Sequence, residues 1–466
     1  MPAQTEQKIL IIAYHFPPDN KVGANRPAKF AKYLSRFGWR PYVLTVKEKY
    51  IEGKDNDRLK EVEDLPIFRT SVWPTPLDLL VQGRNSLVRL LRKKENAKVP
   101  RPSGAIVPSQ EKRPSGGLRS FLRSMKRYFI SIFAVPDEVN GWFVPAVWRG
   151  YWLIKKEGIG VIMTSCPPRT TTLIGLALSK LTGARLLTDL RDPWFLLGGK
   201  PKHLRCQLTD KVELWLEKKI MEDSDKVITT TEQYTHFLHA HYPRIQRDKF
   251  YTLHNGYDQE DFDGLATPEP NKKFTLVYLG TFYFARTPKE FLCALSALFK
   301  EQSIPPGEIE VNFFGNVKSA GGDQVENLIQ SYGLSGSVSL RETLPYKQSL
   351  FQMKRSDLLL LFAPDDDEQN YAIPGKTFEY IGAGKTILCI GDKGATAELI
   401  RKTGTGVVVN ASRVDEIRDA IRDLYFHWKS GRKFESTFDR RGFERGALTR
   451  ELVQLLVPEE SGTVLK

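Results

Sequence analysis

Ile373-Pro-Gly-Lys-Thr-Phe-Glu-Tyr380 follows an apolar run, Asp357-Leu-Leu-Leu-Leu-Phe362, and an acidic loop at residues 365–368. The apolar run is too short for a helix and predicts a buried strand. Pro374 suits the first turn of a helix, because the amide that it lacks would be unpaired there. This stretch therefore predicts a strand followed by a helix, the repeating unit of a parallel α/β sheet.

The predicted start of this helix offers groups that suit a nucleotide. Its free amides and the positive end of its dipole bind anions, and Gly375 allows a ligand to approach the backbone closely. Lys376 adds a cation in the same turn, and Glu379 follows on the same face, where a carboxylate can accept ribose hydroxyls. The plain alternative is a strand-to-helix connection with an exposed pair of charges, since short motifs are weak signals.

Strands and helices alternate along almost the whole chain. In the first half, strands are predicted near residues 8–13, 41–46, 160–164, 185–189 and 226–230, with helices near 25–37, 169–181 and 205–221. After a polar, Pro-rich stretch at 267–273, strands are predicted near 274–279, 310–314, 337–340, 357–362, 386–390 and 406–409. Such alternation implies parallel strands with crossover helices, and hence two doubly wound, Rossmann-like domains that face each other across a cleft.

We assign the first of these domains to residues 1–265 and the second to residues 272–430. In open parallel sheets, ligands bind beyond the carboxyl ends of the strands. We therefore expect a ligand of the predicted cleft to be bound by the loops that follow the strands.

Length, cysteines and hydropathy narrow the class of protein. The chain of 466 residues is too long for one ordinary core. Its four cysteines are far apart in the sequence and fit neither a zinc site nor a disulfide framework, which favours a reducing compartment. The sequence shows no signal peptide and no apolar stretch of the roughly 20 residues that span a bilayer. We therefore expect a cytoplasmic protein.

An insertion at residues 75–135 interrupts the alternation and carries most of the positive charge. The formal net charge of the chain is +14, and residues 84–127 contain 13 Lys or Arg against two Glu, a net charge of +11. Basic and apolar residues are interleaved at 118–133, as in helices that lie on a membrane surface. We expect this basic helical and loop insertion to hold the protein peripherally on anionic membrane; the alternative is a helix packed on its own domain with solvated basic residues.

Several segments, in order along the chain, resemble GT-B glycosyltransferases, in particular the retaining family-four type that builds bacterial surface polysaccharides. Residues 374–380 resemble the donor-binding segment of that family. Four further segments match: Tyr14-His-Phe-Pro-Pro-Asp-Asn-Lys-Val-Gly23 followed by Arg26, Thr164-Ser-Cys-Pro-Pro168, Asp189-Leu-Arg-Asp-Pro-Trp194, and His254-Asn-Gly-Tyr-Asp258. The resemblance covers nearly the whole chain except about residues 75–135.

The resemblance implies a hexosyltransferase-type enzyme that moves a sugar from a nucleotide-sugar donor to a lipid-linked or glycan acceptor. It places the acceptor on the first domain and the nucleotide sugar on the second, and it implies that a last helix, within residues 431–466, packs back on the first domain. No cofactor is expected. The one tempting exception to the lack of an Asp-x-Asp pair after a strand, as in metal-dependent transferases, is the run Asp365-Asp-Asp-Glu368. We interpret this run as a solvated loop, so no metal is expected. We expect the enzyme on the inner face of the membrane.

The transfer breaks a sugar–phosphate bond, so fixed cations and amides must meet the charge on the departing diphosphate. The candidates are Lys376, the amide of Gly375, and Arg286 in the loop that leaves the first strand of the second domain. Glu379 is expected to hold the ribose. Gly23 would let the loop after the first strand approach the diphosphate or the acceptor.

Three further residues are candidates on the acceptor side. Arg26 is expected to bind a phosphate of the acceptor. Asp192 is a catalytic candidate that would orient an acceptor hydroxyl, with Arg191 beside it. The alternative is that Asp192 and Arg191 simply pair with each other.

Two positions depart from the family's pattern. The family commonly has an Arg directly after the glycine that corresponds to Gly280 and a Lys about six residues on, whereas this chain has Thr281 and, nearby, Arg286. The first of two glutamates that the family places seven residues apart would fall at Tyr371. A carboxylate from the acidic loop, Asp367 or Glu368, could take its place.

Two other classes of protein remain open. A nucleotide-sugar epimerase could use the same two-domain architecture. A nucleic-acid binder is suggested by the net charge, but such proteins spread basic residues over a folded face, whereas here they lie mainly in one insertion. We therefore expect no nucleic-acid partner.

Overall fold

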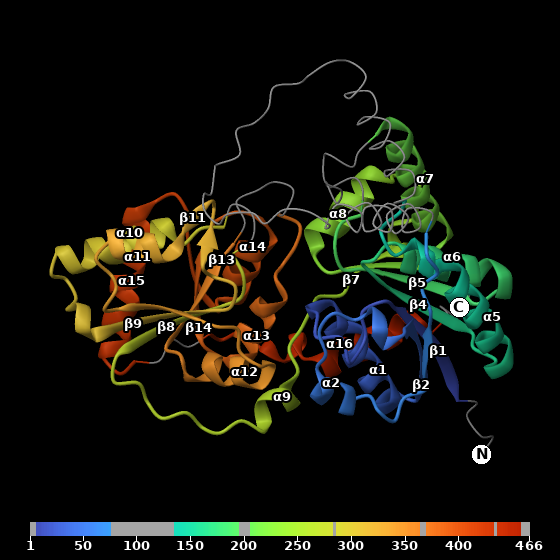
Figure 1. The fold of residues 1–466 in the computed structure, drawn as a ribbon, viewed down its shortest axis with the longest axis horizontal. Helices are drawn as coiled ribbons and strands as arrows, with labels where there is room; N and C mark the ends of the chain where they lie inside the picture. The colour runs from blue at the N-terminus through green and yellow to red at the C-terminus, as the bar shows by residue number, and fades with distance from the viewer. Residues whose placement is uncertain are drawn as a thin grey trace, which may run out of the picture. The chain divides into compact units, whose positions relative to one another are not determined.

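The protein is described from a computed structural model, which places residues 6–75, 135–194, 206–282, 286–363, 370–432 and 436–457. The basic insertion at 84–127 and the acidic loop with Asp367 and Glu368 lie outside the described residues. The chain divides into two compact units, residues 1–227 with 244–249, and residues 228–243 with 250–466 (Figure 1).

The first sheet has seven strands in the order β3-β2-β1-β4-β5-β6-β7. They are β1 (Gln7–Ala13), β2 (Trp39–Val46), β3 (Ile67–Thr70), β4 (Val161–Cys166), β5 (Arg185–Leu190), β6 (Lys226–Thr229) and β7 (Phe250–Thr252). The pairs from β3 through β5 are parallel. The chain first builds β2 and β3 on one side of β1 and then crosses to β4 on the other, so the strand order reverses between β1 and β4.

Helices accompany this sheet as the alternation predicts. They are α1 (Asn25–Leu34), α2 (Asn56–Lys60), α5 (Phe143–Glu157), α6 (Thr170–Thr182), α7 (Gln207–Asp223) and α8 (Glu232–His241). Most residues of the central strands are buried because both faces of the sheet are covered, as in β1, where five consecutive residues are buried. One core cluster joins alternate residues of β1, β2 and β4 with side chains of α5 and α6.

The second sheet has six strands, all parallel, in the order β12-β9-β8-β13-β14-β15. They are β8 (Phe274–Leu279), β9 (Ile309–Phe314), β12 (Val338–Arg341), β13 (Leu358–Phe362), β14 (Thr386–Ile390) and β15 (Gly406–Val409). A short antiparallel pair, β10 (Ser319–Ala320) and β11 (Asp323–Gln324), lies outside this sheet. Here the order reverses between β8 and β13.

Helices cover both faces of the second sheet (Figure 1). They are α9 (Gln259–Asp263), α10 (Lys289–Lys300), α11 (Val325–Ser331), α12 (Tyr346–Arg355), α13 (Gly375–Ala383), α14 (Gly394–Thr403) and α15 (Val414–Lys429). A further helix, α16 (Arg445–Leu456), follows them in the chain. Leu358, Leu360 and Phe362 of β13 pack with α10 and α15, whereas Leu359 and Leu361 pack with α12, α13 and α14. This period of two along the strand divides one sheet between two cores.

The last helix, α16, is tied to β7 by one hydrogen bond. Tyr251 in β7 donates to the Glu451 carboxylate at 2.6 Å. Among the residues that the structure describes, no helix is long and apolar enough to cross a membrane. The two parallel sheets with helices on their faces confirm the predicted fold class.

Candidate functional site

The start of α13 lies at the place in the second sheet where open α/β sheets bind ligands. β13 ends at Phe362, and α13 begins at Gly375. Pro374 caps the helix in an extended conformation instead of entering its first turn. Because the strand order reverses between β8 and β13, the loops that follow these two strands flank the switch point of the sheet.

Lys376 joins the first turn of α13 to the end of β8. Its Nζ donates to the main-chain oxygen of Leu279 at 3.0 Å and lies 3.8 Å from the centre of the Tyr278 ring. Gly280 follows with a φ of +146°, and a Cβ there would lie 2.6 Å from Nζ. Glycine at position 280 therefore allows both the backbone conformation and the close approach of the lysine.

Three charged side chains, Lys376, Arg286 and Glu379, interact electrostatically at this point. The pKa of Lys376 is lowered well below its usual value, chiefly because burial disfavours the charged form; the Arg286 cation lowers it further, and the Glu379 carboxylate opposes the shift. Two cations therefore act on each other here, and an anionic ligand would relieve their repulsion. Perturbed titration of a group at a switch point is a common sign of a functional site.

Two tyrosines fix the loop that carries Arg286. Tyr278 donates from its hydroxyl to the Thr281 oxygen at 2.9 Å and stacks on Phe282 with 4.8 Å between ring centres. The Tyr380 hydroxyl accepts the Leu279 amide at 3.0 Å. Sequence reasoning missed both supporting tyrosines, although Tyr380 closes the motif that it singled out.

The structure thus brings four of the predicted donor-binding residues to one place. Gly375, Lys376 and Glu379 lie on α13, and Arg286 lies between β8 and α10. Glu379 is half-buried. Residues 283–285 of the loop after β8 lie outside the described part, so the alternative roles of Thr281 and Arg286 stay predictions.

In the first unit, Arg191 ties together three loops at the switch point of the first sheet. Its guanidinium donates to the main-chain oxygens of Gly23 at 2.5 Å, Pro167 at 2.7 Å and Cys166 at 3.2 Å. A Cβ at Gly23 would lie 2.9 Å from Arg191 Nη1, so this glycine makes room for the guanidinium. Arg191 thus holds these loops together, and its contact with the acceptor stays a prediction.

Arg26 lies in the core, where it faces a carboxylate. It is only 2 % exposed, and its Nε and Nη2 donate to the fully buried carboxylate of Asp189 at 2.9 Å each. Two such bonds in parallel orient the guanidinium firmly. The structure therefore directs Arg26 toward Asp189, and its role in binding an acceptor phosphate stays a prediction.

Asp192 follows β5 and is accessible to solvent. Although the side chain is exposed, protein surrounds it, and the resulting desolvation raises the pKa of Asp192; Arg191 opposes the shift, and Asp189 adds to it.

After β1, the His15 Nδ1 lies 2.7 Å from the carboxylate of the buried Asp19. Desolvation alone would raise the pKa of Asp19, but the hydrogen bonds from His15 and from the Lys21 amide lower it below its usual value. This pair orders the loop that was predicted to approach the ligand.

The sequence matches no protein-family model and none of the curated proteins with which it was compared. Among solved structures, it is similar to a glycosyltransferase from Rickettsia africae at 14% identity, over 97% of this chain and 98% of that one, with a TM-score of 0.59.

WaaG, a glycosyltransferase involved in lipopolysaccharide biosynthesis, is similar at 13% identity, over 97% and 100% of the two chains, with a TM-score of 0.53. A UDP-GlcNAc 2-epimerase from Methanocaldococcus jannaschii is similar at 11% identity, over 97% and 99%, with a TM-score of 0.50. At these identities the likeness shows the fold, which is of the GT-B type.

Proposed function

We propose that the protein is a glycosyltransferase that moves a sugar from a nucleotide-sugar donor to a lipid-linked or glycan acceptor. One observation carries the proposal: at the switch point of the second sheet, the start of α13 carries Lys376, which interacts electrostatically with Arg286 and Glu379. These groups suit the diphosphate and the ribose of one nucleotide.

The chemistry follows from the charge of the leaving group. As the sugar–phosphate bond breaks, negative charge grows on the diphosphate, and Lys376, Arg286 and the amides of α13 would stabilise it. The Lys376 proton is held weakly in the free protein. A diphosphate beside it would favour the charged form and so place a full cation on the departing oxygen. Glu379 would fix the ribose.

For the acceptor we propose the exposed Asp192 and the loop around Gly23. Asp192 would orient the incoming hydroxyl, and the leaving phosphate would take its proton on the same face, as the family resemblance implies for a retaining enzyme. No metal takes part in this scheme. We further propose that residues 84–127 hold the enzyme on the cytoplasmic face of an anionic membrane, because of their net charge of +11.

A thermal-shift panel of UDP-, GDP-, ADP- and dTDP-sugars tests the donor site. A ligand at about 100 times its Kd stabilises the fold by about 2.7 kcal/mol, so the true donor should raise the melting temperature clearly. Lys376→Ala should remove that shift. If no nucleotide sugar stabilises the wild-type protein, the proposal is wrong.

Epimerisation of a nucleotide sugar is the second candidate, because an epimerase shares the fold. An epimerase converts the donor sugar without any acceptor. NMR of the donor after incubation with the protein alone decides between the two: a new sugar configuration on an intact nucleotide sugar identifies an epimerase.

A further inference from the structure

We propose that an aromatic and basic surface of the first unit docks onto an anionic lipid bilayer. This docking surface is formed by the apolar residues Trp73, Val144, Trp148 and Trp152 with the cations Lys47, Arg69 and Arg149. It is distinct from the basic insertion, and it requires no assumption about the reaction.

The helix α5 has two apolar faces, and among the residues that the structure describes, only one of these faces is covered. Ala146, Leu153 and Ile154 pack in the core of the first unit. Trp148 and Trp152, one turn apart, are 68% and 53% exposed, and their rings meet edge to face at 6.0 Å. Val144, a further turn back, is exposed as well. A row of large apolar side chains in solvent marks an interaction surface.

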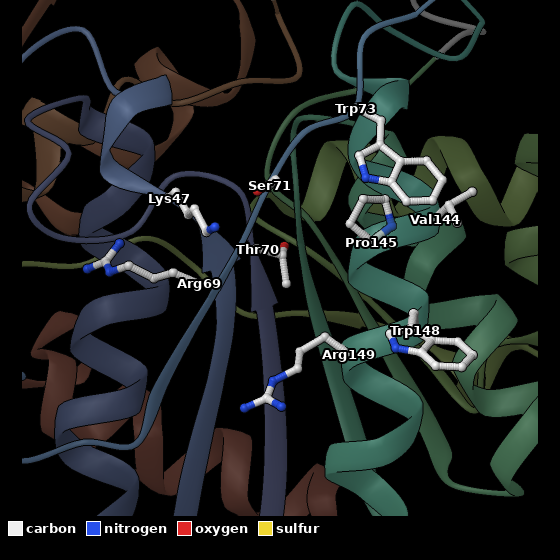
Figure 2. A pocket seen from close by; sticks show the side chains of 9 residues that line it. All are labelled: Lys47, Arg69, Thr70, Ser71, Trp73, Val144, Pro145, Trp148 and Arg149. Carbon is white, nitrogen blue, oxygen red and sulfur yellow. The ribbon is translucent and has the colours of Figure 1, made fainter.

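Beside this face lies a hollow of about 470 Å³ (Figure 2). Trp73, Val144 and Trp148 form its apolar part, and Lys47 directly after β2, Arg69 in β3 and Arg149 in α5 also line it. The Arg69 guanidinium turns away from Trp73 and Trp148 (Figure 2) and donates to the main-chain oxygens of Pro17 at 2.7 Å and Val46 at 3.3 Å. Lys47 and Arg149 are therefore the cations that the hollow offers to a ligand. None of the described residues that line the hollow is a carboxylate. Its described lining therefore combines exposed tryptophans with positively charged side chains.

The positive charge of the docking surface is not neutralised within the described part of the chain. No carboxylate there forms an ion pair with Lys47 or Arg149. Glu48, next to Lys47, is instead paired with Lys54 at 2.8 Å. The Arg149 guanidinium lies over the Phe68 ring, 4.9 Å from its centre, and keeps its charge available.

The backbone around the docking surface is held in place. The Trp73 amide donates to the Gly141 oxygen at 2.9 Å, and the buried Trp142 donates from its indole to the Thr70 hydroxyl at 2.7 Å. A Cβ at Gly141 would lie 2.0 Å from the Trp73 oxygen, so only glycine permits this approach. Because β3 and the start of α5 are tied together, little ordering is needed when the surface binds.

The chemistry of the docking surface fits a bilayer better than a protein. Tryptophan prefers the boundary between headgroups and hydrocarbon, and Lys and Arg are drawn to anionic headgroups. A second copy of this chain would bring like charges, Lys47 and Arg149 of each copy, together across a two-fold axis, which opposes association. An anionic bilayer offers an apolar layer for the indoles and negative charge for the cations at once.

Flotation of the full-length protein with vesicles tests the proposal. The vesicles contain phosphatidylcholine with or without phosphatidylglycerol, and some carry brominated acyl chains that quench tryptophan fluorescence. Wild-type protein should bind only the anionic vesicles and be quenched there. The double variant W148S/W152S should bind more weakly and be quenched less, and Arg149→Ala should weaken binding about fivefold.

Trp215 provides a matched control, because it is 60% exposed and belongs to another helix, α7, none of whose residues form the docking surface. Trp215→Ser should float like the wild type. Far-ultraviolet circular dichroism checks that each variant is folded, and transfer to a soluble acceptor without vesicles separates docking from the proposed reaction.

Several outcomes would overturn the proposal. If the wild-type protein does not bind anionic vesicles, the surface does not dock onto a bilayer. Equal flotation of W148S/W152S and the wild type would assign membrane binding elsewhere, for instance to residues 84–127. Self-association that W148S/W152S abolishes, without vesicle binding, would make the surface a contact between copies.

Discussion

Lys376 reaches from the first turn of α13 to the end of β8, where its Nζ is 3.0 Å from the main-chain oxygen of Leu279. The contact holds a cation between the loops that follow β8 and β13, where the strand order of the second sheet reverses. It also explains Gly280, whose missing side chain leaves room for the ammonium group. The proposed donor site is therefore organised around one lysine.

Lys376→Ala should nearly abolish sugar transfer while the protein stays folded. Loss of one preorganised contact to a developing charge costs about 2.7–4 kcal/mol, or a hundred- to thousandfold in kcat. Steady-state kinetics with the donor found by thermal shift measures the effect. Lys347→Ala, which removes an exposed lysine from α12 in the same unit, should leave kcat unchanged. Wild-type turnover by Lys376→Ala would remove this residue from the mechanism.

Donor binding should take up a proton at Lys376. The pKa of this lysine is lowered in the free protein, and a diphosphate beside it would raise the pKa again. Affinity should therefore weaken as the pH rises through the lowered pKa. Calorimetry in buffers of different ionisation enthalpy measures the uptake, which should vanish in Lys376→Met. Uptake that persists in this variant would point to another group.

Glu379→Ala should weaken binding of the free nucleoside diphosphate as well as of the whole donor. A hydrogen bond to a charged group contributes about 1.5–3 kcal/mol, so the Kd should rise about ten- to hundredfold. Titration calorimetry with the diphosphate alone shows the effect without chemistry. Should Glu379→Ala bind the diphosphate as tightly as the wild type, the carboxylate does not contact the ribose.

Arg26→Ala should destabilise the first unit. Removing one partner of a buried ion pair leaves an uncompensated charge and costs about 3–5 kcal/mol of unfolding free energy. Denaturant unfolding measures this loss for the Arg26–Asp189 pair. Lys60→Ala, which breaks the exposed pair with Asp57, should change stability by less than about 1 kcal/mol. Normal stability of Arg26→Ala together with a raised KM for the acceptor would favour the phosphate role instead.

Transfer should proceed in EDTA at an undiminished rate. The proposal assigns the charge of the leaving diphosphate to side chains and helix amides, which do not depend on a divalent ion. Activity that is lost in EDTA and restored by magnesium or manganese would show that a metal shares this task. The acidic loop at 365–368 would then be the first place to search.

The fold could be predicted because its strands are buried on both faces. Runs such as residues 274–279 and 357–362 are mostly apolar, and the structure has strands there. Short strands were missed where that signal fades, as in β3, whose residues are mostly half-buried. The first turn of α13 was predicted to within one residue, since Pro and Gly constrain the backbone locally.

The contacts of the candidate site could not be predicted, because they join distant parts of the sequence. Nothing local links Arg26 to Asp189, 163 residues away, or Arg191 to the oxygen of Gly23. The docking surface is partly visible in the sequence, because Val144, Trp148 and Trp152 are spaced by four residues. That pattern alone, however, equally suits a buried helix face. Exposure can be read only from the folded chain.

The central claim is tested most directly by transfer itself. The full-length protein would be incubated with a nucleotide sugar labelled in the sugar, chosen by the thermal-shift panel, and with a bacterial membrane lipid extract as acceptor. The account predicts that label moves into the lipid or glycan fraction as free nucleoside diphosphate is released, and that Lys376→Ala does neither. Binding of the nucleotide sugar without any transfer of label, or equal transfer by Lys376→Ala, would contradict it.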